Sequence, residues 1–122
     1  MELVYRDLTE RVLGAAIEVH KSLGPGFLET NYETAFAVEL SFLGIAYERQ
    51  RPIEIRHRGL IVRKHRMDFI VQKCLVVEIK TADNFDAAHF AQVKSYLKAT
   101  GCKVGLLLNF KKPILAIKRF IL

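Results

Sequence analysis

Two acidic residues and a lysine are the side chains of this sequence best suited to chemistry. Asp68 is followed by Glu78 and then, two positions later, by Lys80. Carboxylate oxygens are the ligands that hard divalent ions such as Mg²⁺ prefer in proteins. A lysine beside such an ion could orient or deprotonate an attacking water molecule. The three residues therefore indicate metal-assisted hydrolysis, provided that the fold brings them together.

The segment 66–80 has the pattern of an antiparallel hairpin. If residues 72–74 form a three-residue turn, Val71 lies opposite Leu75 and Asp68 lies opposite Glu78. Because side chains alternate between the two faces of a strand, one face is then entirely apolar and is predicted to be core. That face consists of Met67, Phe69, Val71, Leu75, Val77 and Ile79.

The opposite face of this hairpin carries an electrostatic conflict. The register places the carboxylates of Asp68 and Glu78 opposite each other, with Cβ atoms roughly 5 Å apart, an arrangement that normally destabilises a sheet. A bound cation would remove the conflict. The alternative is a solvated face on which Asp68 pairs diagonally with Lys80 and Arg66 pairs with Glu78. The hairpin alone leaves both interpretations open.

Two predicted helices add candidate site residues. Asp86 can cap a helix that runs to about Thr100, with Gly101 as its left-handed stop. Gln92 and Tyr96 lie four residues apart on one face of this helix. Glu29 falls in the first turn of an earlier helix, predicted over residues 28–43, where the helix dipole alone already favours a carboxylate.

In their order and spacing these motifs resemble the PD-(D/E)xK nuclease superfamily. The string D-x9-E-x-K at 68–80 is followed by Q-x3-Y at 92–96, as in the branch that carries a QxxxY helix. Upstream, residues 26–32 read G-x-x-E-x-x-Y, similar to the signature of the small GxxExxY proteins of that superfamily. Further blocks at 23–29, 76–80, 89–92, 96–101 and 104–110 extend the resemblance over nearly the whole chain.

The resemblance implies a fold and a set of roles. It implies a single α/β domain over residues 1–122, with a restriction-endonuclease-like mixed β-sheet flanked by α-helices. It further implies that Asp68 and Glu78 hold Mg²⁺ or Mn²⁺, helped by the Ile79 carbonyl. The remaining catalytic positions that it implies are Lys80, Glu29, Gln92 and Tyr96.

Positive charge is concentrated in the second part of the chain. Residues 1–48 hold 3 Lys/Arg and 8 Asp/Glu, whereas residues 49–122 hold 16 Lys/Arg and 5 Asp/Glu. A basic segment next to a metal site suits a phosphate backbone, because neutralising phosphates and releasing counterions supplies most sequence-independent affinity. A solubilising surface is the alternative. The predicted nucleic-acid contacts are Arg56, Arg58, Arg63, Lys64 and Arg66.

Composition favours one compact domain. The chain has 122 residues, of which 51% are hydrophobic, which is too short for two ordinary domains. The two cysteines lack metal-ligand spacing, and no export or membrane-spanning segment is present, so we expect a cytoplasmic protein. Further strands are predicted near 45–50, 52–57, 60–64, 103–109 and 115–121, and a first helix from the capping box at 7–10 to residue 23.

These observations favour a metal-dependent enzyme that hydrolyses phosphodiester bonds, with a nucleic acid, expected to be DNA, as partner. The main alternative is a non-catalytic module that keeps the nuclease fold and binds nucleic acid or another protein. The sequence leaves the oligomeric state open, a homo-oligomer included.

Overall fold

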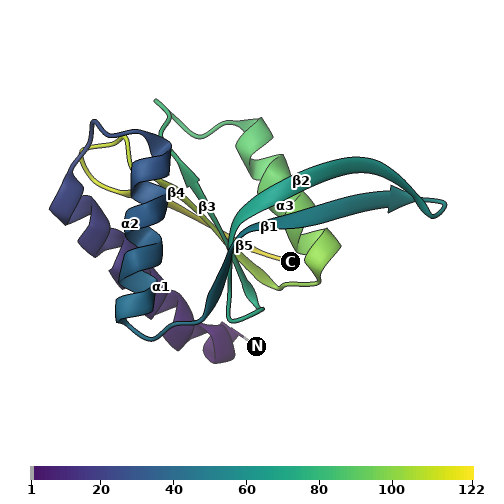
Figure 1. Cartoon of the computed structure of the whole chain (residues 1–122), viewed down its shortest axis with the longest axis horizontal. Helices are drawn as coiled ribbons and strands as arrows, with labels where there is room; N and C mark the ends of the chain where they lie inside the picture. Colours follow the sequence, from purple (N-terminus) through teal and green to yellow (C-terminus); the bar gives the residue numbers. More distant parts are fainter. Residues whose placement is uncertain (1) are drawn as a thin grey trace.

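The computed structural model describes residues 2–122, and side chains from Tyr5 onwards. Five strands form one mixed sheet in the order β1-β2-β3-β4-β5 (Figure 1). The elements, in chain order, are α1 (Glu2–Leu23), α2 (Glu29–Phe42), β1 (Tyr47–His57), β2 (Leu60–Val71), β3 (Leu75–Lys80), α3 (Ala87–Thr100), β4 (Val104–Asn109) and β5 (Ala116–Ile121). The predicted α/β mixed sheet with flanking helices is confirmed.

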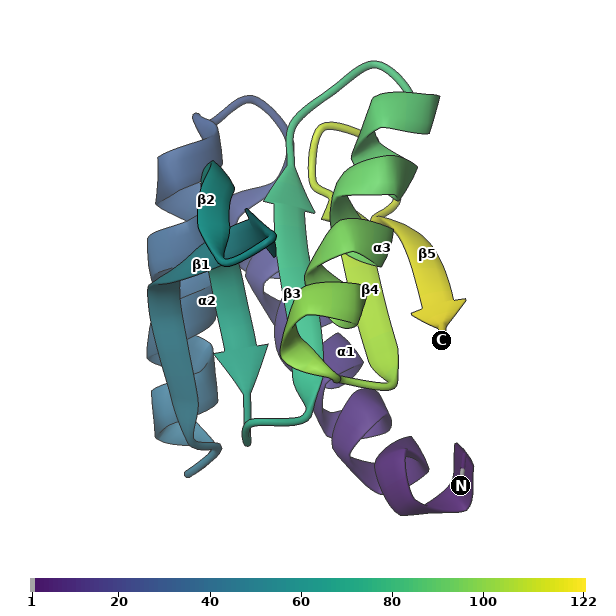
Figure 2. The same cartoon turned by 90° about the vertical axis from the view of Figure 1, so that its right-hand side faces the viewer.

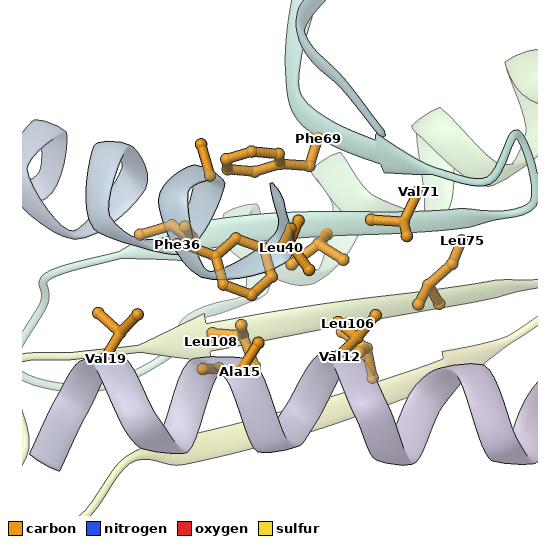
Figure 3. Close-up of a cluster of buried hydrophobic side chains, with 14 of the residues drawn as sticks. Val12, Ala15, Val19, Phe36, Leu40, Phe69, Val71, Leu75, Leu106 and Leu108 are labelled. Carbon is orange, nitrogen blue, oxygen red and sulfur yellow. The ribbon is translucent and has the colours of Figure 1, made fainter. Parts of the chain in front are cut away.

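Helices cover both faces of the sheet. Helices α1 and α2 pack on one face through a buried cluster that includes Val12, Phe36 and Leu40 (Figure 3). Helix α3 packs on the other face through a second cluster that includes Val93 and Leu97. No helix within residues 2–122 is both long and apolar enough to cross a membrane.

The middle of the sheet is a parallel pair, β3 and β4, joined by α3. Strands covered on both faces read as continuous apolar runs, and here only Glu78 and Asn109 interrupt the runs with buried polar side chains. Both polar residues lie near the carboxyl ends of their strands. Figure 2 shows that β3 ends at the same end of the molecule as α2 and α3 begin.

Strands β1 and β2 are longer than predicted. The predicted strands at 45–50 and 52–57 form one strand, and 60–64 continues into the hairpin strand. Pro52 does not interrupt β1, because β1 is an edge strand and one side of its backbone needs no ladder partner. The two strands join at Arg58 and Gly59, with φ of 51° and 80°, as a tight two-residue hairpin turn requires.

Residues 54–64 form an arm that leaves the body of the protein. Ile53 is the last residue of β1 that joins a buried cluster, and beyond it the two strands pair only with each other. Figure 1 shows this arm projecting to one side of the sheet. The arm exposes Leu60, Ile61 and Val62 among its basic residues.

Two further predictions need correction. Helix α1 begins at Glu2 rather than at the capping box, because Tyr5 and Leu8 pack on the core and extend the helix backwards. Met67 lies in the cluster under α3, not with Phe69 on the opposite face. Pairing with both neighbouring strands is interrupted at Asp68, so regular alternation is lost between these two side chains.

Candidate metal and phosphate site

Two carboxylates close the end of the β2–β3 hairpin. The turn at 72–74 and the pairs Val71–Leu75 and Phe69–Val77 are confirmed, but the ladder stops there. The Asp68 amide donates to Glu78 Oε2 at 2.6 Å, and the Ile79 amide donates to Asp68 Oδ2 at 2.8 Å. The side chains therefore take the place of the missing backbone pairs, and each is fixed by the backbone of the other strand.

Burial makes the negative charge of this pair costly. Glu78 is 1% exposed, and burial followed by the charge of Asp68 raises its pKa from 4.5 to about 8. Burial also raises the pKa of Asp68, from 3.8 to about 6, against the opposing Ile79 hydrogen bond. Within the described residues neither carboxylate forms the diagonal ion pair, with Lys80 or Arg66, that a solvated face would need. The solvated interpretation is wrong for this hairpin.

Helix α3 presents its predicted residues to the same place. Lys80 Nζ donates to Gln92 Oε1 at 2.9 Å. The ring of Tyr96 is buried, and burial together with the charges of Glu78 and Asp68 raises the pKa of its hydroxyl. Asp86 caps the helix by accepting from the His89 amide at 3.0 Å, and Gly101 ends it with φ of 76°. These caps fix the rotation of α3 that turns Gln92 and Tyr96 towards the site.

Glu29 approaches the site from α2, on the other side of the sheet. Burial raises its pKa, while the positive charge of Lys80, its principal charged neighbour, acts to lower the same pKa. Within the described residues its side chain neither donates nor accepts a hydrogen bond, so its oxygens face open space. The Tyr32 hydroxyl fixes the loop before α2, donating to the Gly24 carbonyl at 2.5 Å and accepting from the Phe27 amide at 3.2 Å.

Two polar residues that the sequence reasoning missed connect α2 to the carboxylate pair. Gln50 Nε2 donates to Glu33 Oε1 at 2.6 Å and lies 3.3 Å from Asp68 Oδ1. Glu33 is buried and also accepts from Arg49 Nε at 3.0 Å. Glu33 lies one turn after Glu29, a spacing that marks it as a neighbour on the same helix face. No sequence signal identifies Gln50, whose φ of 54° depends on the irregular pairing beside it.

Asn109 is a third functional position that sequence reasoning missed. It is fully buried, and its amide donates to the Ala82 carbonyl at 2.7 Å while its Oδ1 accepts from the Ala82 amide at 3.2 Å. The Phe110 amide also donates to the Lys80 carbonyl at 3.0 Å. The segment that follows Lys80 is therefore held to the end of β4. A polar residue closing an apolar strand was the available signal.

The predicted nucleic-acid residues lie on or beside the arm, and all five are exposed. Arg56, Arg58, Arg63 and Lys64 belong to the arm itself, away from the carboxylates. Arg66 lies at the base of the arm, two residues before Asp68. Arg56 is partly engaged, because it pairs with Glu54 at 2.9 Å and donates to the Gly59 carbonyl at 3.0 Å.

The donor set at the hairpin end fits a hard divalent ion. Asp68 and Glu78 supply carboxylate oxygens, and no hydrogen bond from the described residues reaches Glu78 Oε1. The side chains described include no group of three His, Cys, Asp or Glu placed to hold a metal, so Glu29 is not a third direct ligand here. Mg²⁺ commonly uses one or two carboxylates and fills its other positions with water and substrate phosphate. A cation would also offset the like charges whose burial raises both pKa values.

Comparisons with known proteins agree with this geometry. The crystal structure of SSO0001 aligns with a TM-score of 0.61 at 19% identity, over 98% of this chain and 60% of that one. At that identity the likeness establishes the fold alone, and the chain spans about 60% of the length of that protein. A search of curated proteins found no match. The model of the PD-(D/E)XK nuclease superfamily matches residues 6–120. Since that match takes in nearly the whole chain, the protein belongs to the PD-(D/E)XK nuclease superfamily.

Proposed function

We propose that this protein is a metal-dependent nuclease that hydrolyses DNA phosphodiester bonds. One observation carries the proposal: Asp68 and Glu78 are held face to face by each other's backbones, with Lys80 beside them. A fold stabilised for its own sake would not bury two carboxylates against each other, because their mutual repulsion and desolvation oppose folding. The arrangement is explained if it serves a bound cation.

Each residue then has a distinct task. A Mg²⁺ or Mn²⁺ ion held by Asp68 and Glu78, with the Ile79 carbonyl, would polarise the scissile phosphate and activate water. Lys80 positions the attacking water and stabilises the charge that develops on the phosphate. Gln92 holds the Lys80 ammonium, and Tyr96 supports the same face of α3. Glu29 acts from α2, through water, at the side of the site that the other carboxylates leave open.

We also infer that the protein is one of the small GxxExxY proteins. Tyr32 fixes the loop that begins α2, and Glu29 lies on the first turn that this loop presents. The free thiols of Cys74 and Cys102 suit a reducing compartment, and we propose the cytoplasm. Arg58, Arg63 and Lys64 of the arm, together with Arg56 and Arg66, are proposed to contact DNA phosphates.

A cleavage assay tests the proposal. Wild-type protein is incubated with linear, circular and single-stranded DNA in Mg²⁺, in Mn²⁺ and in EDTA. We expect metal-dependent cleavage of at least one substrate, abolished in Asp68→Asn and retained in Asp83→Asn, a control at an exposed aspartate. Cleavage that persists in Asp68→Asn contradicts the site. DNA binding with no cleavage in any metal favours the non-catalytic module.

A further inference from the structure

A groove lies between the arm and helix α3, outside the carboxylate site. Its volume is about 560 Å³. Strand β1 supplies Glu54, Ile55 and Arg56, and α3 supplies Ala91, Lys94, Ser95, Lys98 and Ala99. All eight residues are exposed or half-buried, so the groove opens to solvent. Figure 1 shows the arm running beside α3.

The charge of the groove is positive. Lys94 and Lys98 lie one turn apart on the same side of α3, and both are exposed. Among the described residues neither lysine takes part in an ion pair, whereas Arg56 is paired with Glu54 across the groove at 2.9 Å. The two lysines are therefore the cations free to meet an anionic ligand.

The floor of the groove indicates which part of a nucleic acid it suits. Ala91, Ser95 and Ala99 recur every four residues and present only small side chains to the groove. None of the eight lining residues is aromatic. Proteins that hold single strands usually stack the bases on aromatic rings, whereas duplex contacts to the backbone need only cations and room.

The groove continues from the proposed cleavage centre. Gln92 and Tyr96, which face the carboxylates, lie on the adjoining stripe of the same helix. The Tyr96 ring packs against His65 of β2, with ring centroids 5.6 Å apart, and so joins α3 to the base of the arm. A strand bound along α3 would run from the arm towards Lys80.

We propose that this groove binds the sugar-phosphate backbone of duplex DNA through Lys94 and Lys98, beyond the phosphate that is cleaved. The inference rests on the proposed function and names the path by which the substrate leaves the site. The arm lies along one side of the backbone and α3 along the other. Binding in the groove is independent of base sequence, because its contacts are to phosphates.

Salt-dependent binding tests the groove. Duplex DNA affinity is measured by fluorescence anisotropy at several salt concentrations, in Ca²⁺ or EDTA, for wild type and for the double variant Lys94→Ala, Lys98→Ala. Each lost phosphate contact lowers the slope of log K against log salt by about 0.9, so the double variant should lose about 1.8. The matched control is Lys21→Ala, Lys103→Ala, which removes the same charge from exposed positions and should keep the wild-type slope.

The outcomes separate the groove from the cleavage chemistry. A slope equal to the control's in the double variant overturns the groove, even where wild type cleaves DNA. A loss of slope with no cleavage by wild type supports the groove and contradicts the nuclease proposal. Loss of affinity for single strands but not for duplex overturns the duplex as occupant. Absence of DNA binding by wild type overturns both.

A footprint gives a second measurement that does not depend on the lysines. Ser95→Cys is introduced into a Cys74→Ser background, and the rate of alkylation is followed with and without duplex. We expect duplex to slow the reaction at least several-fold. Ser22→Cys, on an exposed position of α1, should react at the same rate in both conditions. Equal protection or equal reactivity at the two positions contradicts the groove.

Discussion

The carboxylate pair is the residue-scale feature that distinguishes this hairpin from a structural one. Asp68 and Glu78 each accept an amide hydrogen that a regular ladder would have given to a backbone carbonyl. Their orientation is thus fixed before any ligand arrives. Preorganisation of this kind is what a metal site requires, because the protein then spends little entropy on ordering its ligands.

Metal binding should depend on both carboxylates. Asp68→Asn with Glu78→Gln keeps the amide-accepting oxygens and removes the charges, so the fold should be retained. Loss of even an outer-shell partner typically weakens metal binding by about 10–100-fold, and loss of both ligands should exceed that. Calorimetric titration with Mn²⁺ measures the effect, with Asp7→Asn, Glu18→Gln as the charge-matched control. Equal binding by the two double variants would refute the assignment.

Stability without metal should fall as the pH rises. The folded pKa of Glu78, about 8, lies above its ordinary value of 4.5, so the folded state holds this proton more tightly than the unfolded state does. Its contribution is fully present below about pH 4.5 and is lost as the pH rises through about 8. In EDTA, wild type should lose on the order of a few kcal/mol of unfolding free energy between pH 5 and pH 8.5.

Glu78→Gln should flatten that dependence. The glutamine stays neutral and can still accept the Asp68 amide, so the variant should unfold at higher denaturant concentration than wild type at pH 8.5. Glu18→Gln, at an exposed position, should follow the wild-type curve. A Glu78→Gln variant no more stable than wild type at pH 8.5 would mean that the buried charge does not strain the fold.

The hairpin register was predictable from the sequence, since the apolar alternation and turn placed Asp68, Glu78 and Lys80 on one face. The supporting residues were not. Gln50 reaches Asp68 only because pairing between β1 and β2 is interrupted there, and alternation rules assume unbroken pairing. Local patterns describe a strand, but they do not describe where two strands separate.

At the scale of elements, caps gave the most reliable predictions. Asp86 and Gly101 bounded α3 correctly, and α2 lies within one residue of its predicted range. The start of α1 was wrong because tertiary packing of Tyr5 outweighed a local capping pattern. The length of β1 was wrong because Pro52 was read as a break, although an edge strand tolerates it.

The contact between α3 and β4 should be sensitive to a single methyl group. A Cβ at Gly105 would lie 2.7 Å from Val93 Cγ1, and valine has little rotamer freedom in a helix with which to yield. Gly105→Ala should therefore destabilise the fold by about 1–3 kcal/mol and displace α3, which carries Gln92. Chemical denaturation measures the change.

Gly14→Ala is the matched control for this prediction. Nothing lies within 4 Å of a Cβ at Gly14, which is in the middle of α1. Alanine there should stabilise by roughly 0.5–1 kcal/mol, because it removes the entropy cost of a helical glycine. Equal effects of the two substitutions would show that α3 does not pack against β4 as closely as the structure places it.

At the scale of the whole molecule, charge and architecture divide the protein into two parts. The acidic residues 1–48 build α1 and α2, which cover one face of the sheet. The basic residues 49–122 supply the arm, the groove and α3. The sequence showed the division of charge, but the projection of the arm could not be predicted, because it depends on which strand segments remain without a partner.

Lys80 separates catalysis from folding and binding in this account. Its neighbours Asp68 and Glu78 carry the metal, and the arm and groove carry the DNA, so Lys80→Ala should leave thermal stability, Mn²⁺ affinity and most DNA affinity unchanged. An ordinary exposed lysine could be replaced at a cost of no more than about 0.5 kcal/mol and with no loss of turnover. Lys103→Ala, at an exposed position before β4, provides that control.

The most direct test is Mn²⁺-supported DNA cleavage by wild type, Lys80→Ala and Lys103→Ala, with thermal midpoint and DNA affinity measured on the same preparations. We predict that Lys80→Ala folds and binds DNA like wild type while its turnover falls by roughly 100-fold or more. Lys103→Ala should cleave at the wild-type rate. Cleavage by folded Lys80→Ala at the wild-type rate would contradict the mechanism.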